Sequence, residues 1–125
     1  MTTMKVGGHT LALAFTLDAM SQMQEAFNGK SVMTEKGFSE LFASPGDTLK
    51  LLAILANQGE ELAGKAPEIT GKWLGQHMKP GRLPEVQRVI LDAIQKGMDM
   101  EHADDDPEEE VDVVLEELKK NDSAG

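Results

Sequence analysis

The chain has no cysteine and no tyrosine, a single tryptophan, and far fewer basic than acidic residues. The absence of cysteine excludes a disulfide scaffold, a thiolate metal site and a cysteine nucleophile, and it fits a reducing cytosol. No hydrophobic run approaches the length of a membrane-spanning helix. Residues 1–8 lack the apolar segment of a signal peptide. These features predict a cytoplasmic protein.

The acidic charge is concentrated at one end of the sequence. The formal net charge is −10, and residues 101–125 alone contain 11 acidic and 2 basic residues. Residues 1–100 are therefore nearly neutral. This division predicts one folded helical body, residues 1–100, followed by an acidic tail, residues 101–125, that meets another molecule.

A short β-hairpin is predicted at the N-terminus. Two apolar segments, residues 4–6 and 9–15, are joined by Gly7-Gly8, which supplies the positive φ angles that a tight hairpin turn needs. Leu11, Leu13 and Phe15 alternate with smaller residues, so the second segment has one apolar face.

A helix is expected directly after the hairpin. Thr16 or Asp18 can cap its start, and Asn28-Gly29 ends it. Apolar residues recur along it at a spacing of three to four, which gives one apolar face. These residues are Leu17, Met20, Met23 and Phe27.

The next start signals are Thr34, before a short helix, and Ser44, before a longer helix with Pro45 at its first position. The longer helix is apolar nearly all round, so we expect it to be the central helix of the core and to stop at Gly59.

Pro84 opens a clearly amphipathic helix. Residues 60–78 form a weaker helical pattern whose expected face consists of Ile69, Trp73, Leu74 and His77.

The acidic tail also contains a helix pattern. Asp106 is an acidic cap, Pro107 stands at the first helical position, and the following glutamates favour the positive end of the helix dipole. An apolar stripe follows, formed by Val111, Val114, Leu115 and Leu118. A helix this short is unstable alone in water. It therefore needs to pack on a partner protein or on the folded body of its own chain. The expected fold is mainly α: a small helical domain with an N-terminal β-hairpin and a tethered acidic C-terminal helix.

Residues 59–66 nearly match the phosphate-binding loop G-x-x-x-x-G-K-[ST], but the context does not fit. Ala66 stands where a hydroxyl holds magnesium, Pro67 follows, and a helix rather than a strand comes first. The alternative is a helix end and a loop. No other arrangement of residues indicates catalysis, so we expect neither an enzyme nor a cofactor.

Metal binding is not expected either. The acidic run around Asp104 lacks the glycine and the bidentate glutamate of an EF-hand, since Glu109 and Leu115 occupy those positions. The histidines are scattered, and each is expected to be solvated or hydrogen-bonded. They are His9, His77 and His102.

A small regulatory protein is the alternative function. It would be a DNA-binding factor that uses Lys72, Arg82 and Arg88, or an acidic mimic of nucleic acid. Acidic residues interleave with these basic residues in the sequence, and the acidic tail repels phosphate groups. Nucleic-acid binding is therefore disfavoured.

Residues 13–29 resemble the opening of the tail assembly chaperones of long-tailed bacteriophages and prophages. Those proteins begin with a short hairpin that runs into a helix of the form L-x-F-[DT]-x-[ND]-A-[LM]-x-x-[LM]-x-E-x-x-G. The chain departs from this pattern in the position of Asn28-Gly29, one residue late, and in its unusually acidic tail. The matching positions are Phe15, Leu17, Ala19, Met20, Met23, Glu25 and Gly29.

The resemblance implies a non-enzymatic role in viral tail assembly in the host cytoplasm. Such chaperones coat the tape measure protein, keep it soluble and help recruit tail tube subunits. We expect protein binding through the tail residues Val111, Val114, Leu115 and Leu118. Met20, Met23 and Phe27 are further candidates, with a role in the core as the alternative for them. Self-association is left open, and membrane contact is not expected.

Overall fold

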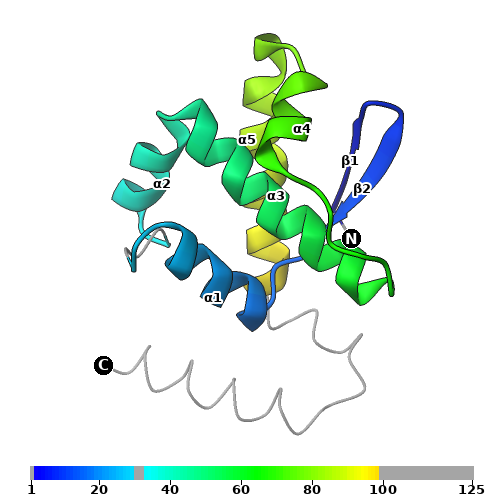
Figure 1. Ribbon diagram of the computed structural model, residues 1–125. Coiled ribbons are helices and arrows are strands. Elements are labelled where there is room, and N and C mark those ends of the chain that lie inside the picture. The colour runs from blue at the N-terminus through cyan, green and yellow to red at the C-terminus, as the bar shows by residue number, and fades with distance from the viewer. Residues whose placement is uncertain (1, 30–32, 99–125) are drawn as a thin grey trace, which may run out of the picture.

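The computed structural model describes residues 2–29 and 33–98 of the chain (Figure 1). It is mainly helical with a two-stranded antiparallel hairpin at its N-terminus, so the predicted fold class is confirmed. The acidic tail, its predicted helix and His102 lie outside the described residues.

The hairpin pairs β1 (Thr2–Val6) with β2 (His9–Leu13). Val6 lies opposite His9, so the turn consists of Gly7 and Gly8, with φ angles of 56° and 82°. An L side chain rarely adopts two successive positive φ angles, which explains the Gly-Gly pair. One face of the hairpin is buried through Met4, Val6, Leu11 and Leu13.

Helices α1 (Leu17–Ala26) and α2 (Glu35–Phe42) begin where the sequence predicts. Thr16 accepts a hydrogen bond from the Ala19 amide, and Thr34 accepts one from the Gly37 amide. These caps satisfy amide groups that a helix start leaves without partners. After α1, Asn28 and Gly29 both have positive φ angles and end the helix.

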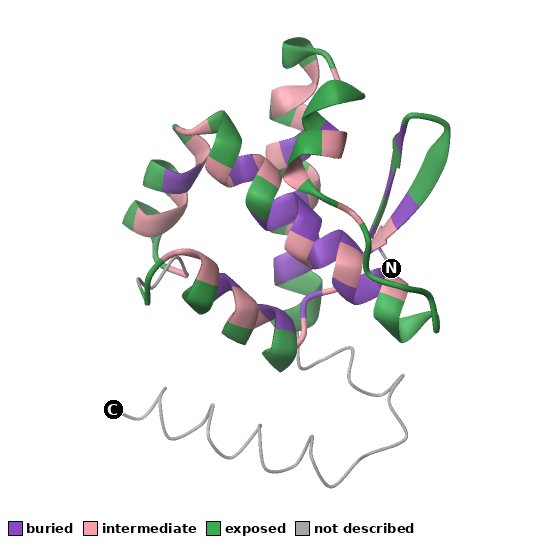
Figure 2. Cartoon of the chain, in the orientation of Figure 1, coloured by how far each residue is buried: buried purple, intermediate pink, exposed green. Residues whose placement is uncertain are grey.

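Helix α3 (Pro45–Leu62) is the centre of the body. Ser44 caps it, with Pro45 at its first position, as predicted. The prediction that it stops at Gly59 is wrong, because the helix runs on to Leu62 and Gly64 follows with a φ of 80°. In Figure 2, buried residues gather along α3, and they include its leucines 51, 52 and 55.

Two glycines bring helix backbones onto the N-terminal segment. Gly59 of α3 lies against Ala12, where a Cβ would stand 2.7 Å from the carbonyl carbon. Gly97 lies against Phe15, where a Cβ would stand 2.8 Å from the Phe15 Cβ. Gly59 is therefore a contact residue within a helix and not a helix stop.

The body is completed by α4 (Gly71–Gln76), the short 3₁₀ turn η1 (Pro80–Arg82) and α5 (Leu83–Met98). Helix α5 is amphipathic, as predicted, and buries Val86, Ile90, Ala93 and Ile94. The expected face of residues 60–78 is only partly correct. Leu74 is fully buried and Trp73 is half-buried, whereas His77 is exposed and residues 63–70 form no helix.

Candidate functional site

An open groove of about 810 Å³ lies over one side of α3. Its floor comes from two rows of residues that repeat every four positions and therefore share one face of the helix. Leu49, Ala53 and Asn57 form one row, and Ile54 belongs to the other, with the exposed Lys50 one turn earlier at the rim. The side chain of Ala53 is small and leaves space at the middle of the floor. Together with Leu49 and Ile54 it makes the floor largely apolar.

The walls of the groove come from two segments distant in sequence. Gln22, Glu25 and Ala26 of α1 form one wall. The other wall comes from Ile69 and the start of α4. Both walls stand on α3, because α1 and α4 each pack against that helix.

Asn57 fixes the second wall to the floor. Its Nδ2 donates to the Ile69 carbonyl oxygen at 2.7 Å, and its Oδ1 accepts from the Ile69 amide at 2.8 Å. Asn57 therefore satisfies both backbone groups of one residue in a segment that has no secondary structure. The sequence offered a weak signal for this role, which is the amide pair Asn57-Gln58 directly after the apolar run of residues 51–56.

The rim carries charges of both signs. Lys50 and Lys72 are exposed on α3 and α4, and Glu25 is exposed on α1. The Lys50 ammonium also lies 5.5 Å from the ring centre of Phe27, which is within the range of a cation–π contact. An apolar floor with a polar rim is the form of a groove that accepts an amphipathic helix.

The methionine and phenylalanine candidates of α1 separate in the structure. Met23 is only 1% exposed and belongs to the core, which is the alternative that the sequence left open. Met20 and Phe27 are half-buried and pack against the core. The tail candidates Val111, Val114, Leu115 and Leu118 lie outside the described residues.

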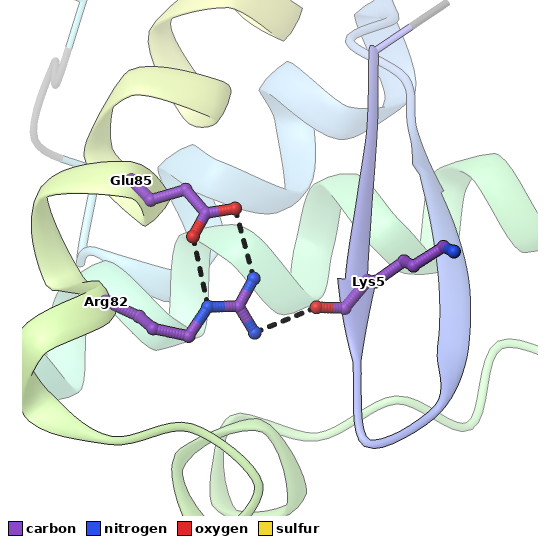
Figure 3. A network of polar contacts seen from close by, with 3 residues as sticks. All are labelled: Lys5, Arg82 and Glu85. Atoms are coloured by element: carbon purple, nitrogen blue, oxygen red, sulfur yellow. Dashed lines mark hydrogen bonds and ion pairs between the residues drawn. The ribbon is translucent and has the colours of Figure 1, made fainter.

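Perturbed carboxylates occur away from the groove. Arg82 forms two hydrogen bonds of 3.0 Å with Glu85 and donates a third, of 2.8 Å, to the Lys5 carbonyl oxygen (Figure 3). The hydrogen bonds from Arg82 hold the pKa of Glu85 below its ordinary value, and the positive charge of Arg82 lowers it further. This arrangement ties the start of α5 to β1.

A second tie joins the other end of β1 to α5. The Thr2 hydroxyl donates to the Asp92 carboxylate at 2.6 Å, and Lys96 pairs with the same oxygen at 3.2 Å. The hydrogen bond from Thr2, followed by that from Lys96, lowers the pKa of Asp92. Asp92 therefore holds the hairpin to α5 directly, and Glu85 does so through Arg82, which is a structural role for both carboxylates.

The three basic residues of the DNA-binding alternative line three different hollows. Lys72 lines the groove, and Arg82 is engaged with Glu85 and Lys5. Arg88 borders a different hollow beside Asp92. In addition, α4 packs mainly on α3, so α4 and α5 do not form the pair that a helix-turn-helix needs.

An aromatic cluster that no sequence pattern indicates lies between the hairpin and α4. The Trp73 ring stacks on His77, with ring centres 4.5 Å apart, and meets His9 edge-on at 5.6 Å. His77 Nδ1 also lies 2.8 Å from the Trp73 carbonyl oxygen. Both histidines are exposed and hold the hairpin beside α4, because Gly7 lies against the His77 ring.

Comparison of the chain with protein-family models, curated proteins and solved structures finds no match. Within residues 2–29 and 33–98, no group of three or more His, Asp or Glu side chains is placed to hold a metal ion. Over the same residues, no helix is both long and apolar enough to cross a membrane. The groove on α3 offers a largely apolar hollow that three segments of the described body line together.

Proposed function

We propose that this protein is a phage or prophage tail assembly chaperone that binds an apolar helical segment of the tape measure protein in the groove on α3. The observation that carries the proposal is the groove itself, which has an apolar floor and a volume of about 810 Å³. The role is non-enzymatic and is carried out in the host cytoplasm. The bound complex then helps to recruit tail tube subunits.

The resemblance to tail assembly chaperones supports the same site. Residues 13–29 of the matched pattern include all of α1, and α1 supplies one wall of the groove through Gln22, Glu25 and Ala26. The buried pattern residues Phe15, Ala19 and Met23 anchor α1 to the core.

The physical mechanism is reversible burial of apolar side chains. A long helical protein that is not yet assembled exposes apolar stripes, and such stripes aggregate. A groove whose floor residues repeat every four positions accepts side chains with the same repeat on the partner helix. The net negative charge of the chaperone makes coated complexes repel one another, which keeps them in solution.

The DNA-binding alternative gains no support from the positions of its residues, because Lys72, Arg82 and Arg88 line three different hollows. The two functions differ in a simple binding assay. A DNA-binding factor binds duplex DNA with an affinity that falls steeply with salt. The proposed chaperone leaves duplex DNA free at all salt concentrations.

The decisive experiment is co-expression with the long helical protein encoded downstream in the same genome. The wild-type chain is compared with Ile54→Asp, which puts a charge on the half-buried groove floor, and with a chain that ends at Met100. Leu91→Asp is the matched control, because Leu91 is 44% exposed and lies on α5 outside the groove.

We expect the wild-type chain and Leu91→Asp to keep the partner in the soluble fraction and to co-purify with it. Ile54→Asp should lose the partner while its circular dichroism stays helical. Loss of rescue in the shortened chain would place a second contact in the tail residues Val111, Val114, Leu115 and Leu118. If the wild-type chain does not bind the partner, the chaperone proposal is wrong.

A further inference from the structure

The groove also matches a segment of the chain itself. The predicted tail helix carries one apolar stripe, Val111, Val114, Leu115 and Leu118, on a segment that is otherwise strongly acidic. The stripe covers seven residue steps, or about 10 Å of helix. The floor row from Leu49 to Asn57 covers eight steps, or about 12 Å. The stripe and the floor are thus equal in length to within one residue.

The charges of the two surfaces are complementary. Two lysines, Lys50 and Lys72, and one glutamate, Glu25, line the groove. Residues 101–125 contain 11 acidic and 2 basic residues. A tail helix whose apolar stripe faces the floor brings its flanking carboxylates to the lysines on the rim, where opposite charges favour docking and fix its position.

The tail leaves the body near the start of α1, the helix whose far end lines the groove. Gly97, next to the last described residue, lies against Phe15, two residues before α1 begins. Helix α1 has 10 residues, so its far end is only about 15 Å away. Residues 99–106 span up to about 26 Å when extended. The segment between Met98 and Pro107 is therefore long enough for the tail helix to reach the groove of its own chain.

We propose that residues 107–120 fold back as a helix and occupy the groove on α3 of the same chain until a partner helix displaces them. The acidic tail then shields the apolar floor in the free protein. Displacement releases the stripe at the moment when the partner binds. This inference rests on the groove being the binding site of the proposed function, but not on the identity of the partner.

The test uses the full chain and its natural lack of cysteine. A nitroxide on Glu116→Cys, on the side of the helix opposite the stripe, broadens the amide NMR signals of nearby residues. We expect the signals of Ala53, Ile54 and Ile69 to lose most of their intensity. Thr3 and Arg88, which border a different hollow, should keep theirs. Reduction of the nitroxide should restore all signals.

Two variants of the labelled chain separate docking from chance proximity. Leu115→Asp combined with Leu118→Asp removes the apolar contact without touching the core, and the groove signals should recover. Lys50→Glu combined with Lys72→Glu removes the charge attraction, and they should recover in part. Lys36→Glu, on the exposed surface of α2, is the matched control and should change nothing.

Three results would overturn the inference. They are unbroadened groove signals in the wild-type sequence, equal broadening in the stripe variant, and broadening of an isotope-labelled chain by a separate spin-labelled copy, which makes a second copy the occupant. The experiment contains no partner protein. Failure here together with successful co-expression would leave the proposed function intact, and the reverse result would leave docking intact without the chaperone role.

Discussion

Asn57 and Ile69 exchange two hydrogen bonds, so that one side chain of α3 fixes the backbone of a residue twelve positions later. This pair sets the width of the groove, because Ile69 belongs to its wall and Asn57 to its floor. At Ile69, just before α4 begins, the wall is therefore held by one amide side chain.

Asn57→Ala removes both hydrogen bonds and should lower the free energy of unfolding by about 1–3 kcal/mol, since the backbone groups of Ile69 lose their partners in a half-buried place. Urea unfolding measures this change. Hydrogen exchange should show faster exchange at the Ile69 amide. Gln95→Ala, on the exposed face of α5, is the control and should change stability by less than about 0.5 kcal/mol. Unchanged protection of Ile69 would contradict the role of Asn57.

Gly59→Ala should destabilise the body by at least about 1–3 kcal/mol, because the added Cβ overlaps the backbone of Ala12 and forces α3 away from β2. Gly46→Ala is a matched change in the same helix, where a Cβ would meet only the Ser44 Oγ at 4.0 Å. Its effect should be neutral or stabilising by up to about 1 kcal/mol. Thermal unfolding of both variants checks the contrast, and equal losses would show that Gly59 is not a close contact.

Met23→Ala should lower the free energy of unfolding by about 2–5 kcal/mol, because Met23 is 1% exposed and its loss leaves a cavity. Leu17→Ser changes a side chain that is 82% exposed and should alter stability by less than about 0.5 kcal/mol. Urea unfolding separates the two. A small effect at Met23 would instead place this methionine at the surface.

Asp92→Asn should reduce stability at neutral pH and have no effect in strong acid. The hydrogen bond from Thr2 lowers the pKa of Asp92 below its ordinary value of 3.8 in the folded state. The ionised carboxylate therefore stabilises the fold above its ordinary pKa, and this contribution disappears as the pH falls through the lowered value. Urea midpoints of both proteins between about pH 7 and pH 2 should converge toward the acid end. A constant difference over this range would rule out ionisation of Asp92 as the cause.

The local parts of the fold could be predicted because they depend on neighbouring residues. The Gly7-Gly8 turn and the caps at Thr16, Thr34 and Ser44 are all present. The turn requires glycine at both of its positions, and each cap requires a hydroxyl side chain three residues before the amide that it accepts from. Such signals need no knowledge of tertiary contacts.

The groove could not be predicted, because its parts meet only through tertiary packing. A glycine in a sequence marks either a helix end or a close contact, and only the approach of Ala12 decides that Gly59 is the latter. The partnership of Asn57 with Ile69 likewise depends on the path of residues 63–70. The cluster of His9, Trp73 and His77 depends on the hairpin lying beside α4.

The tie between Thr2 and Asp92 has a consequence for the newly made chain. Thr2 begins the first strand, but its hydrogen-bond partner on α5 is made 90 residues later. At bacterial and eukaryotic rates of synthesis this delay is roughly 5–18 s. During that time the apolar face of the hairpin has no α5 to cover it. A protein proposed to shield apolar helices thus emerges from the ribosome with part of its own hairpin uncovered, and its yield in the cell should depend on how quickly α5 is made.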